Sequence, residues 1–168
     1  MIPLPKPLGP GDLTLWRLDD ARFAPTWESG EGSFRVGGRW NSAGVRAVYA
    51  SLDPATAILE VAVHKTFSIL DIVPHVLTRA RIIDPATIHI VQPADVPNPA
   101  WLTPTLPGAG QQAFGDALLQ KHRFVLIPSA VSRHSWNVLF VHELAKGHYD
   151  EIEQERFALD TRLNPPKA

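Results

Sequence analysis

The sequence contains no cysteine. Disulfides, zinc sites with thiolate ligands and thiol nucleophiles are therefore excluded, and this absence fits a reducing compartment. No apolar run approaches the roughly 18 residues that a membrane helix needs. Residues 1–11 hold four prolines and one lysine, so they lack the unbroken apolar stretch of a secretory signal. We expect a cytoplasmic protein that does not enter a membrane.

An excess of positive charge is also missing. Sixteen basic and seventeen acidic residues give a net charge of −1, which argues against direct binding of nucleic acid through bulk charge. The seven histidines show no metal-ligand spacing, and HExxH, Walker A, GxGxxG and GxSxG patterns are absent. The sequence therefore predicts no metal site, no Rossmann-type phosphate turn and no serine hydrolase.

The composition favours one packed domain. The chain has 168 residues, 45% of them hydrophobic, which is an ordinary size for a single core. Sixteen prolines and eleven glycines disfavour a coiled coil or a simple helical bundle. Residues 1–11 are typical of an extended proline-rich arm. We therefore expect this arm followed by a single compact domain over residues 12–168.

Strands and helices are mixed along the chain without a regular βαβ rhythm. Apolar and β-branched runs predict strands at 13–18, 45–51, 70–84 (one or two strands), 124–129 and 136–141. Helices are expected at 55–67, after the N-cap pair Asp53-Pro54, and at 111–122. Long loops are expected at 19–44 and 85–110, and 151–163 fits either helix or strand. This mixture predicts the α+β class rather than a doubly wound sheet.

One carboxylate stands out on the first expected helix. Glu60 lies in AILEVAV, where apolar residues surround it on nearly every side. A charged carboxylate that faces a core must be paired or neutralised, and an opposing arginine would keep it ionised. The alternative is an amphipathic helix with Glu60 in water, which is the ordinary preference of glutamate.

Other polar residues lie where a purely structural sequence favours apolar ones. Arg17 lies in an apolar strand, and Tyr49 lies in another strand, where its ring could stack on a flat heterocycle. Arg39 follows two glycines, which allow a close backbone approach to a ligand, and a guanidinium offers a forked contact to phosphate. Ser129 ends an apolar strand, where its hydroxyl can act as a hydrogen-bond donor.

Taken together, these positions resemble the RES domain, named for its Arg, Glu and Ser. The matching stretches, in the family's order, are LWRL (15–18), SGEGSFRVGGRWNSAGVRAVYAS (29–51), AILEVAVH (57–64), IPSA (127–130), NVLF (137–140) and FALDTRL (157–163). The resemblance implies an α+β domain similar to the core of ADP-ribosyltransferase toxins. It also implies a growth-inhibiting toxin of an Xre–RES toxin–antitoxin pair, with an Xre-type helix-turn-helix antitoxin as its partner.

The resemblance also implies an activity and a site. Family members consume NAD as a substrate rather than as a recycled cofactor, by hydrolysis, by phosphorolysis or by ADP-ribosyl transfer to a protein. The implied catalytic residues are Arg39, Tyr49 and Glu60. The implied substrate-binding residues are Arg17, Arg39, Tyr49, Ser129 and Asn137. The acceptor, whether water, phosphate or a protein side chain, stays open.

The expected chemistry is cleavage of the bond between nicotinamide and ribose, with an oxocarbenium-like transition state. Two other functions stay open at this point. A nucleotide-binding module without turnover would use the same arginines and Tyr49. A metal-free glycosidase needs a second carboxylate about 5–9.5 Å from the first, and the candidates for it are Glu28, Glu31 and Asp53.

Overall fold

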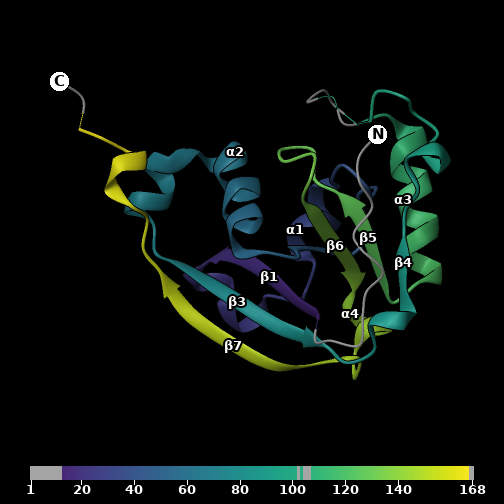
Figure 1. Ribbon diagram of the computed structural model, residues 1–168, viewed down its shortest axis with the longest axis horizontal. Coiled ribbons are helices and arrows are strands. Elements are labelled where there is room, and N and C mark those ends of the chain that lie inside the picture. The colour runs from purple at the N-terminus through teal and green to yellow at the C-terminus, as the bar shows by residue number, and fades with distance from the viewer. Residues whose placement is uncertain (1–12, 102, 104–106, 167–168) are drawn as a thin grey trace.

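The computed structural model describes residues 13–101, 103 and 107–166, and the arm expected at 1–11 lies outside them. The described chain forms one seven-stranded sheet with helices packed against it (Figure 1), which confirms the α+β class. The strands are β1 (Leu13–Asp20), β2 (Ala47–Ser51), β3 (His75–Ile82), β4 (Ile88–Ile90), β5 (Phe124–Pro128), β6 (Trp136–Val141) and β7 (Tyr149–Phe157). The α-helices are α1 (Glu31–Val36), α2 (Pro54–Ile72), α3 (Ala109–Lys121) and α4 (His142–Ala145).

The strand order across the sheet is β4-β5-β6-β2-β1-β3-β7. Neighbouring strands are antiparallel except β4 and β5, which are parallel. In Figure 1, α2 lies over β1, and α3 lies beside β4 and β5. The central strands β1 and β2 share a single register pair, Trp16 with Ser51. The sheet therefore has two well-paired parts that meet at a narrow seam.

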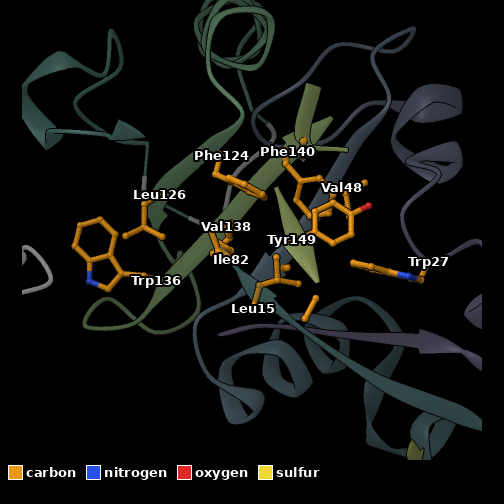
Figure 2. Close-up of a cluster of buried hydrophobic side chains, with 13 residues drawn as sticks. Leu15, Trp27, Val48, Ile82, Phe124, Leu126, Trp136, Val138, Phe140 and Tyr149 are labelled. Atoms are coloured by element: carbon orange, nitrogen blue, oxygen red, sulfur yellow. The ribbon is translucent and has the colours of Figure 1, made fainter. Parts of the chain in front are cut away.

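A cluster of thirteen buried side chains fills one face of the sheet (Figure 2). Val48 and Ala50 contribute from β2, while Tyr49, between them, faces a second cluster beside α3. The Trp27 ring meets Phe140 edge-on at 6.1 Å between ring centroids. Burial of each large apolar side chain contributes about 1.5–3 kcal/mol, so this face anchors the strands whose other face carries Tyr49.

The start of α2 agrees with the sequence prediction. Asp53 is the N-cap, and its carboxylate accepts hydrogen bonds from the Thr56 backbone N–H at 2.8 Å and from the Thr56 hydroxyl at 2.6 Å. Pro54 occupies the first turn, where its missing N–H costs nothing. At Thr66 the backbone leaves the helical region, with φ 68°, and helical structure resumes until Ile72. Glu60 lies in the regular part before this break.

Two loop predictions need correction, and one open assignment is resolved. The expected loop at 19–44 contains a 3-10 helix, Ala21–Thr26, and α1, whose own side chains are not buried. The expected loop at 85–110 contains β4 and two short 3-10 helices, Pro85–Thr87 and Pro93–Asp95. The ambiguous segment 151–163 is a strand up to Phe157, where it pairs with β3, followed by a 3-10 turn at Thr161–Leu163. Within the described residues, no helix combines the length and apolar character needed to cross a bilayer.

Candidate active site

The ends of three strands meet beside α2. Ser51 is the last residue of β2, Asn137 is the second residue of β6, and Ser129 directly follows β5. The sheet register pairs Asn137 with Ser51 on one side and with Ile127 on the other. Because alternate residues of a strand share a face, Ser129 projects to the same side as Ile127 and Asn137. Glu60 reaches this group from α2.

The Glu60 carboxylate is held by two donors through one of its oxygens. The Ser129 hydroxyl donates to Oε1 at 2.8 Å, and the Asn137 side-chain amide donates to the same oxygen at 2.5 Å. Among the described residues no donor binds Oε2, and no arginine forms an ion pair with this carboxylate. The donors to Glu60 are therefore a hydroxyl and an amide, and not the arginine that the sequence analysis considered. The second carboxylate oxygen could accept a hydrogen bond from a ligand.

The Ser129 hydroxyl has a fixed direction. Its oxygen accepts hydrogen bonds from the backbone N–H groups of Val131 at 3.2 Å and Ser132 at 3.1 Å. Because both partners are donors, the single hydroxyl proton is free to point at Glu60. Ser129 is fully buried. The turn after β5 thus presents a hydroxyl donor whose position does not depend on a ligand.

The glycine turn is tied to the sheet through Tyr49. The Tyr49 hydroxyl donates to Asn41 Oδ1 at 2.7 Å and accepts from the Trp40 backbone N–H at 3.0 Å. Gly37 has φ 73°, a conformation that favours glycine. A Cβ on Gly38 would lie 2.6 Å from the Tyr49 hydroxyl oxygen, so only glycine lets the turn approach this closely. The turn that carries Arg39 is therefore set by the phenol.

Tyr49 is influenced by the charges of both Arg39 and Glu60. Burial raises the pKa of Tyr49 above its usual range. The Trp40 N–H hydrogen bond and the positive charge of Arg39 oppose this rise, while the negative charges of Asp116 and Glu60 add to it. The phenol therefore lies within the electrostatic influence of a guanidinium and a carboxylate.

The Arg39 guanidinium keeps part of its hydrogen-bonding capacity. Its Nη1 donates to the backbone carbonyls of Trp101 at 3.0 Å and Thr103 at 3.2 Å. Among residues 13–101, 103 and 107–166, no carboxylate forms an ion pair with Arg39. The side chain is half-buried. A half-buried guanidinium without an anionic partner is suited to a phosphate or carboxylate ligand.

Arg17 has a different position from the one that a phosphate clamp suggests. Its Nη1 donates to the Tyr49 carbonyl at 2.6 Å, and its Nη2 pairs with Asp19 at 2.7 Å. The flanking Trp16 and Leu18 pack with residues of α2, so strand alternation turns Arg17 away from that helix. Burial raises the pKa of Asp19, and the charge of Arg17 opposes this rise. Arg17 closes the seam between β1 and β2, and its contact with substrate stays a prediction.

The three candidates for a second glycosidase carboxylate all have other partners. Glu28 accepts a hydrogen bond from the Tyr149 hydroxyl. Glu31 pairs with Arg35 and Arg46 on the surface. Asp53 caps α2. The geometry therefore does not support a glycosidase pair built on Glu60.

The sequence also predicts no metal site. In the described part of the chain, no group of three or more His, Cys, Asp or Glu side chains is arranged to hold a metal ion.

Several residues of the site were missed at the sequence level. Ser51 donates a hydrogen bond to Asn137, Gln112 donates to the Gly38 carbonyl at 2.8 Å, and Gly115 packs against the Trp40 backbone. A glycine inside an expected helix, such as Gly115, is a sequence signal for close packing. Ser51 and Gln112 carry no such signal, because small polar residues in strands and helices are common.

Comparison with known proteins shows the family of this chain. The RES domain family model matches residues 14–160. The chain is 35% identical over 158 residues to "Toxin Res" of Pseudomonas putida, which covers 90% of this chain and 99% of that protein. It is 30% identical over 151 residues to the "Prs ADP-ribosylating toxin" of Sphingobium sp., covering 80% of this chain and 86% of that protein.

The fold also has a counterpart among solved structures. A chain of the M. tuberculosis MbcT–MbcA toxin–antitoxin complex superposes with a TM-score of 0.70 at 20% sequence identity, covering 88% of this chain and 85% of that chain. The family match spans most of the sequence and includes every site residue considered above. The resemblance seen in the sequence motifs is thereby confirmed, and the chain belongs to the RES domain family of toxins.

Proposed function

We propose that this protein is the toxin of a toxin–antitoxin pair and that it consumes NAD by cleaving the bond between nicotinamide and ribose. The observation that carries the proposal is the Glu60 carboxylate, held through Oε1 by Ser129 and Asn137 while Oε2 has no donor among the described residues. Arg39 precedes Trp40, whose backbone N–H donates to the Tyr49 hydroxyl. The Arg39 guanidinium would supply the positive charge that a pyrophosphate needs.

The carboxylate is suited to an oxocarbenium-like transition state. As the nicotinamide leaves, positive charge develops on the ribose ring, and a fixed anion nearby stabilises that charge more than it stabilises the ground state. A ribose hydroxyl can donate to Oε2, because Oε1 already has two donors. Ser129 and Asn137 therefore orient the carboxylate, and in this proposal Glu60 is the group that meets the ribose.

Tyr49 has a second role in this proposal besides stacking. Its hydroxyl is used in holding the glycine turn, so its first contribution is to fix the Arg39 backbone. Stacking of its ring on nicotinamide stays a prediction. Arg39 would bind the pyrophosphate through the guanidinium nitrogens that have no partner among the described residues.

For the acceptor, we propose a protein side chain, with water and phosphate as the other outcomes of the test. A relative that is 30% identical over 80% of this chain carries the name ADP-ribosylating toxin. For the partner, we propose an antitoxin, since a similarly folded chain was solved in a toxin–antitoxin complex. The resemblance to the RES domain favours an antitoxin of the Xre type. We also propose that the protein acts in the cytoplasm, where NAD is available.

The test follows the fate of NAD labelled in its adenylate half. The purified protein is incubated with labelled NAD alone, with phosphate, and with cell lysate, and free nicotinamide and label on protein are measured. We expect nicotinamide release and label on protein in the lysate arm. Hydrolysis without protein label would reassign the acceptor to water, and a phosphate-dependent product would reassign it to phosphate.

Two variants and their controls test the roles of the charges. Glu60→Gln should lower nicotinamide release about a hundredfold, and Arg39→Ala should raise the KM for NAD about tenfold or more. The matched controls are the exposed Glu155→Gln and Arg35→Ala, which should behave as the wild type. Binding of NAD without any release of nicotinamide would favour the nucleotide-binding module instead. Turnover by Glu60→Gln at the wild-type rate would contradict the mechanism.

A further inference from the structure

The Glu60 cluster continues one residue further into the sheet. The Ser51 hydroxyl donates to Asn137 Oδ1 at 2.8 Å, and the Asn137 amide nitrogen donates to Glu60 Oε1 at 2.5 Å. Ser51 and Asn137 are buried, with 2% and 9% of their surfaces exposed. The hydrogen bonds therefore form a chain from the end of β2 through β6 to α2.

We propose that Ser51 is a positioning residue, which anchors the Asn137 amide so that its NH₂ group stays against Glu60. The proposal rests on the function proposed above. A side-chain amide has a donor end and an acceptor end of nearly the same shape. The Ser51 hydroxyl donates to the acceptor end of the amide, and the carboxylate, which only accepts, takes the donor end. The two contacts together hold the amide in one orientation.

Without the Ser51 hydroxyl, Asn137 Oδ1 loses its donor, and of the two contacts only the one with Glu60 still holds the amide. The carboxylate only accepts, so the amide still presents its nitrogen to Glu60, but its second anchor is lost. The amide is then free to shift away from Oε1, and the carboxylate loses part of its fixed orientation. Ser51 acts on Glu60 through Asn137, because no direct hydrogen bond joins Ser51 to Glu60 among the described residues.

The sheet makes this arrangement rigid. Ser51 and Asn137 are directly paired across β2 and β6, where opposing Cβ atoms are about 4.5–5.5 Å apart. The next strand, β5, pairs Ile127 with Asn137 and then supplies Ser129. Asn137 is thus placed by strand register, and Ser129 lies directly after a strand and is held by the backbone N–H groups of its own turn. This suits a carboxylate that must be oriented before substrate arrives.

The experiment is a double-mutant cycle measured by nicotinamide release. Ser51→Ala should lower kcat about tenfold while the KM for NAD changes less than about twofold, because Ser51 is not placed against substrate. Asn137→Ala should lower kcat at least as much. In the double variant, the Ser51 change should have no further effect beyond about twofold, because Ser51 acts only through Asn137.

The controls separate positioning from folding. Ser135→Ala removes a hydroxyl in the turn between β5 and β6 whose recorded partner is Ser132, so it should leave kcat and KM unchanged. Ser51→Cys keeps the side-chain size with a much weaker donor, so it repeats the test if Ser51→Ala fails to fold. Full multiplication of the two kcat losses in the double variant would overturn the proposal, as would a loss expressed mainly in KM.

A structural readout keeps the proposal testable if the wild type shows no NAD turnover, a result that would count against the proposed function alone. High-resolution crystal structures of the wild type and of Ser51→Ala or Ser51→Cys would be compared at Asn137. We expect the variant to lose or lengthen the contact between the Asn137 amide nitrogen and Glu60 Oε1, with a shifted or disordered amide. An Asn137 amide that still donates to Glu60 in the variant, with unchanged geometry, would refute the positioning role of Ser51.

Discussion

Gly115 in α3 packs closely against the backbone of Trp40, which follows Arg39. A Cβ added there would lie 1.9 Å from the Trp40 carbonyl oxygen and 2.7 Å from its carbonyl carbon. These are backbone atoms, so no side-chain rotation relieves the overlap. Gly115→Ala must therefore move either the helix or the turn that carries Arg39.

Two opposing effects decide the size of the change. Alanine favours the helix by about 1 kcal/mol relative to glycine, while forcing extra volume into a packed site costs about 1–3 kcal/mol or more. A distance of only 1.9 Å between the added Cβ and a backbone oxygen is a severe steric clash. We therefore expect a net loss of about 2 kcal/mol in the free energy of unfolding. For a chain of this length, that lowers Tm by about 4–8 °C.

The same helix provides the matched control. Gly110 has no heavy atom within 4 Å of an added Cβ, so Gly110→Ala should keep or raise Tm, by up to about 4 °C. Thermal unfolding of both variants and the KM of each for NAD give the comparison. Gly115→Ala should also raise the KM, because Arg39 follows the displaced turn. Equal Tm values for Gly115→Ala and the wild type would refute the packing argument.

Two further predictions concern the stability of the fold. Asp53→Ala removes the acceptor for the Thr56 N–H and hydroxyl, so urea denaturation should show a loss of about 1–2 kcal/mol, and a loss below about 0.3 kcal/mol would contradict the capping role. For Asp20, the side-chain and backbone hydrogen bonds from Arg22 lower the pKa to about 2. The folded pKa lies below the unfolded one, so the contribution to stability is present above about pH 4 and is lost as the pH falls toward 2. Asp20→Asn should reduce the loss of unfolding free energy between pH 5 and pH 2 by about 1 kcal/mol, a small value because Arg22 is exposed. Urea denaturation across this pH range measures the difference. The same pH dependence in the variant and the wild type would contradict the stabilising role of the Asp20 carboxylate.

The elements that the sequence predicted well are those whose own residues determine them. The apolar run of β5 is buried throughout, and Asp53-Pro54 marks the start of α2 with local chemistry. In contrast, α1 buries none of its side chains and is bounded by Gly30 and Gly37 with left-handed φ. Its six residues show no apolar periodicity, so the sequence predicted a loop there.

Strand β7 shows the other limit of sequence-based prediction. Its residues are mostly exposed and charged, so neither a helical nor a strand period is evident. The strand is specified by its neighbour: Arg79 pairs with Glu153, and Arg81 pairs with Asp150, across the register with β3. Partners more than sixty residues apart in sequence cannot be recognised from local pattern.

The candidate site divides in the same way. Glu60 could be singled out because a charge among apolar helical residues is costly, and Ser129 because it ends a buried strand. Ser51 could not, because a serine in a strand is ordinary until its partner is known. That partner, Asn137, is 86 residues away. The donors to Glu60 are likewise 69 and 77 residues away.

These separations bear on how activity arises during synthesis. The ribosome must add β6, the sixth of the seven strands, before the Glu60 carboxylate gains its amide donor. A nascent or prematurely terminated polypeptide that ends before residue 136 holds Arg39, Tyr49, Glu60 and Ser129 without the strand that aligns them. A toxin whose proposed site is completed this late would leave its incomplete translation products without the amide donor to Glu60.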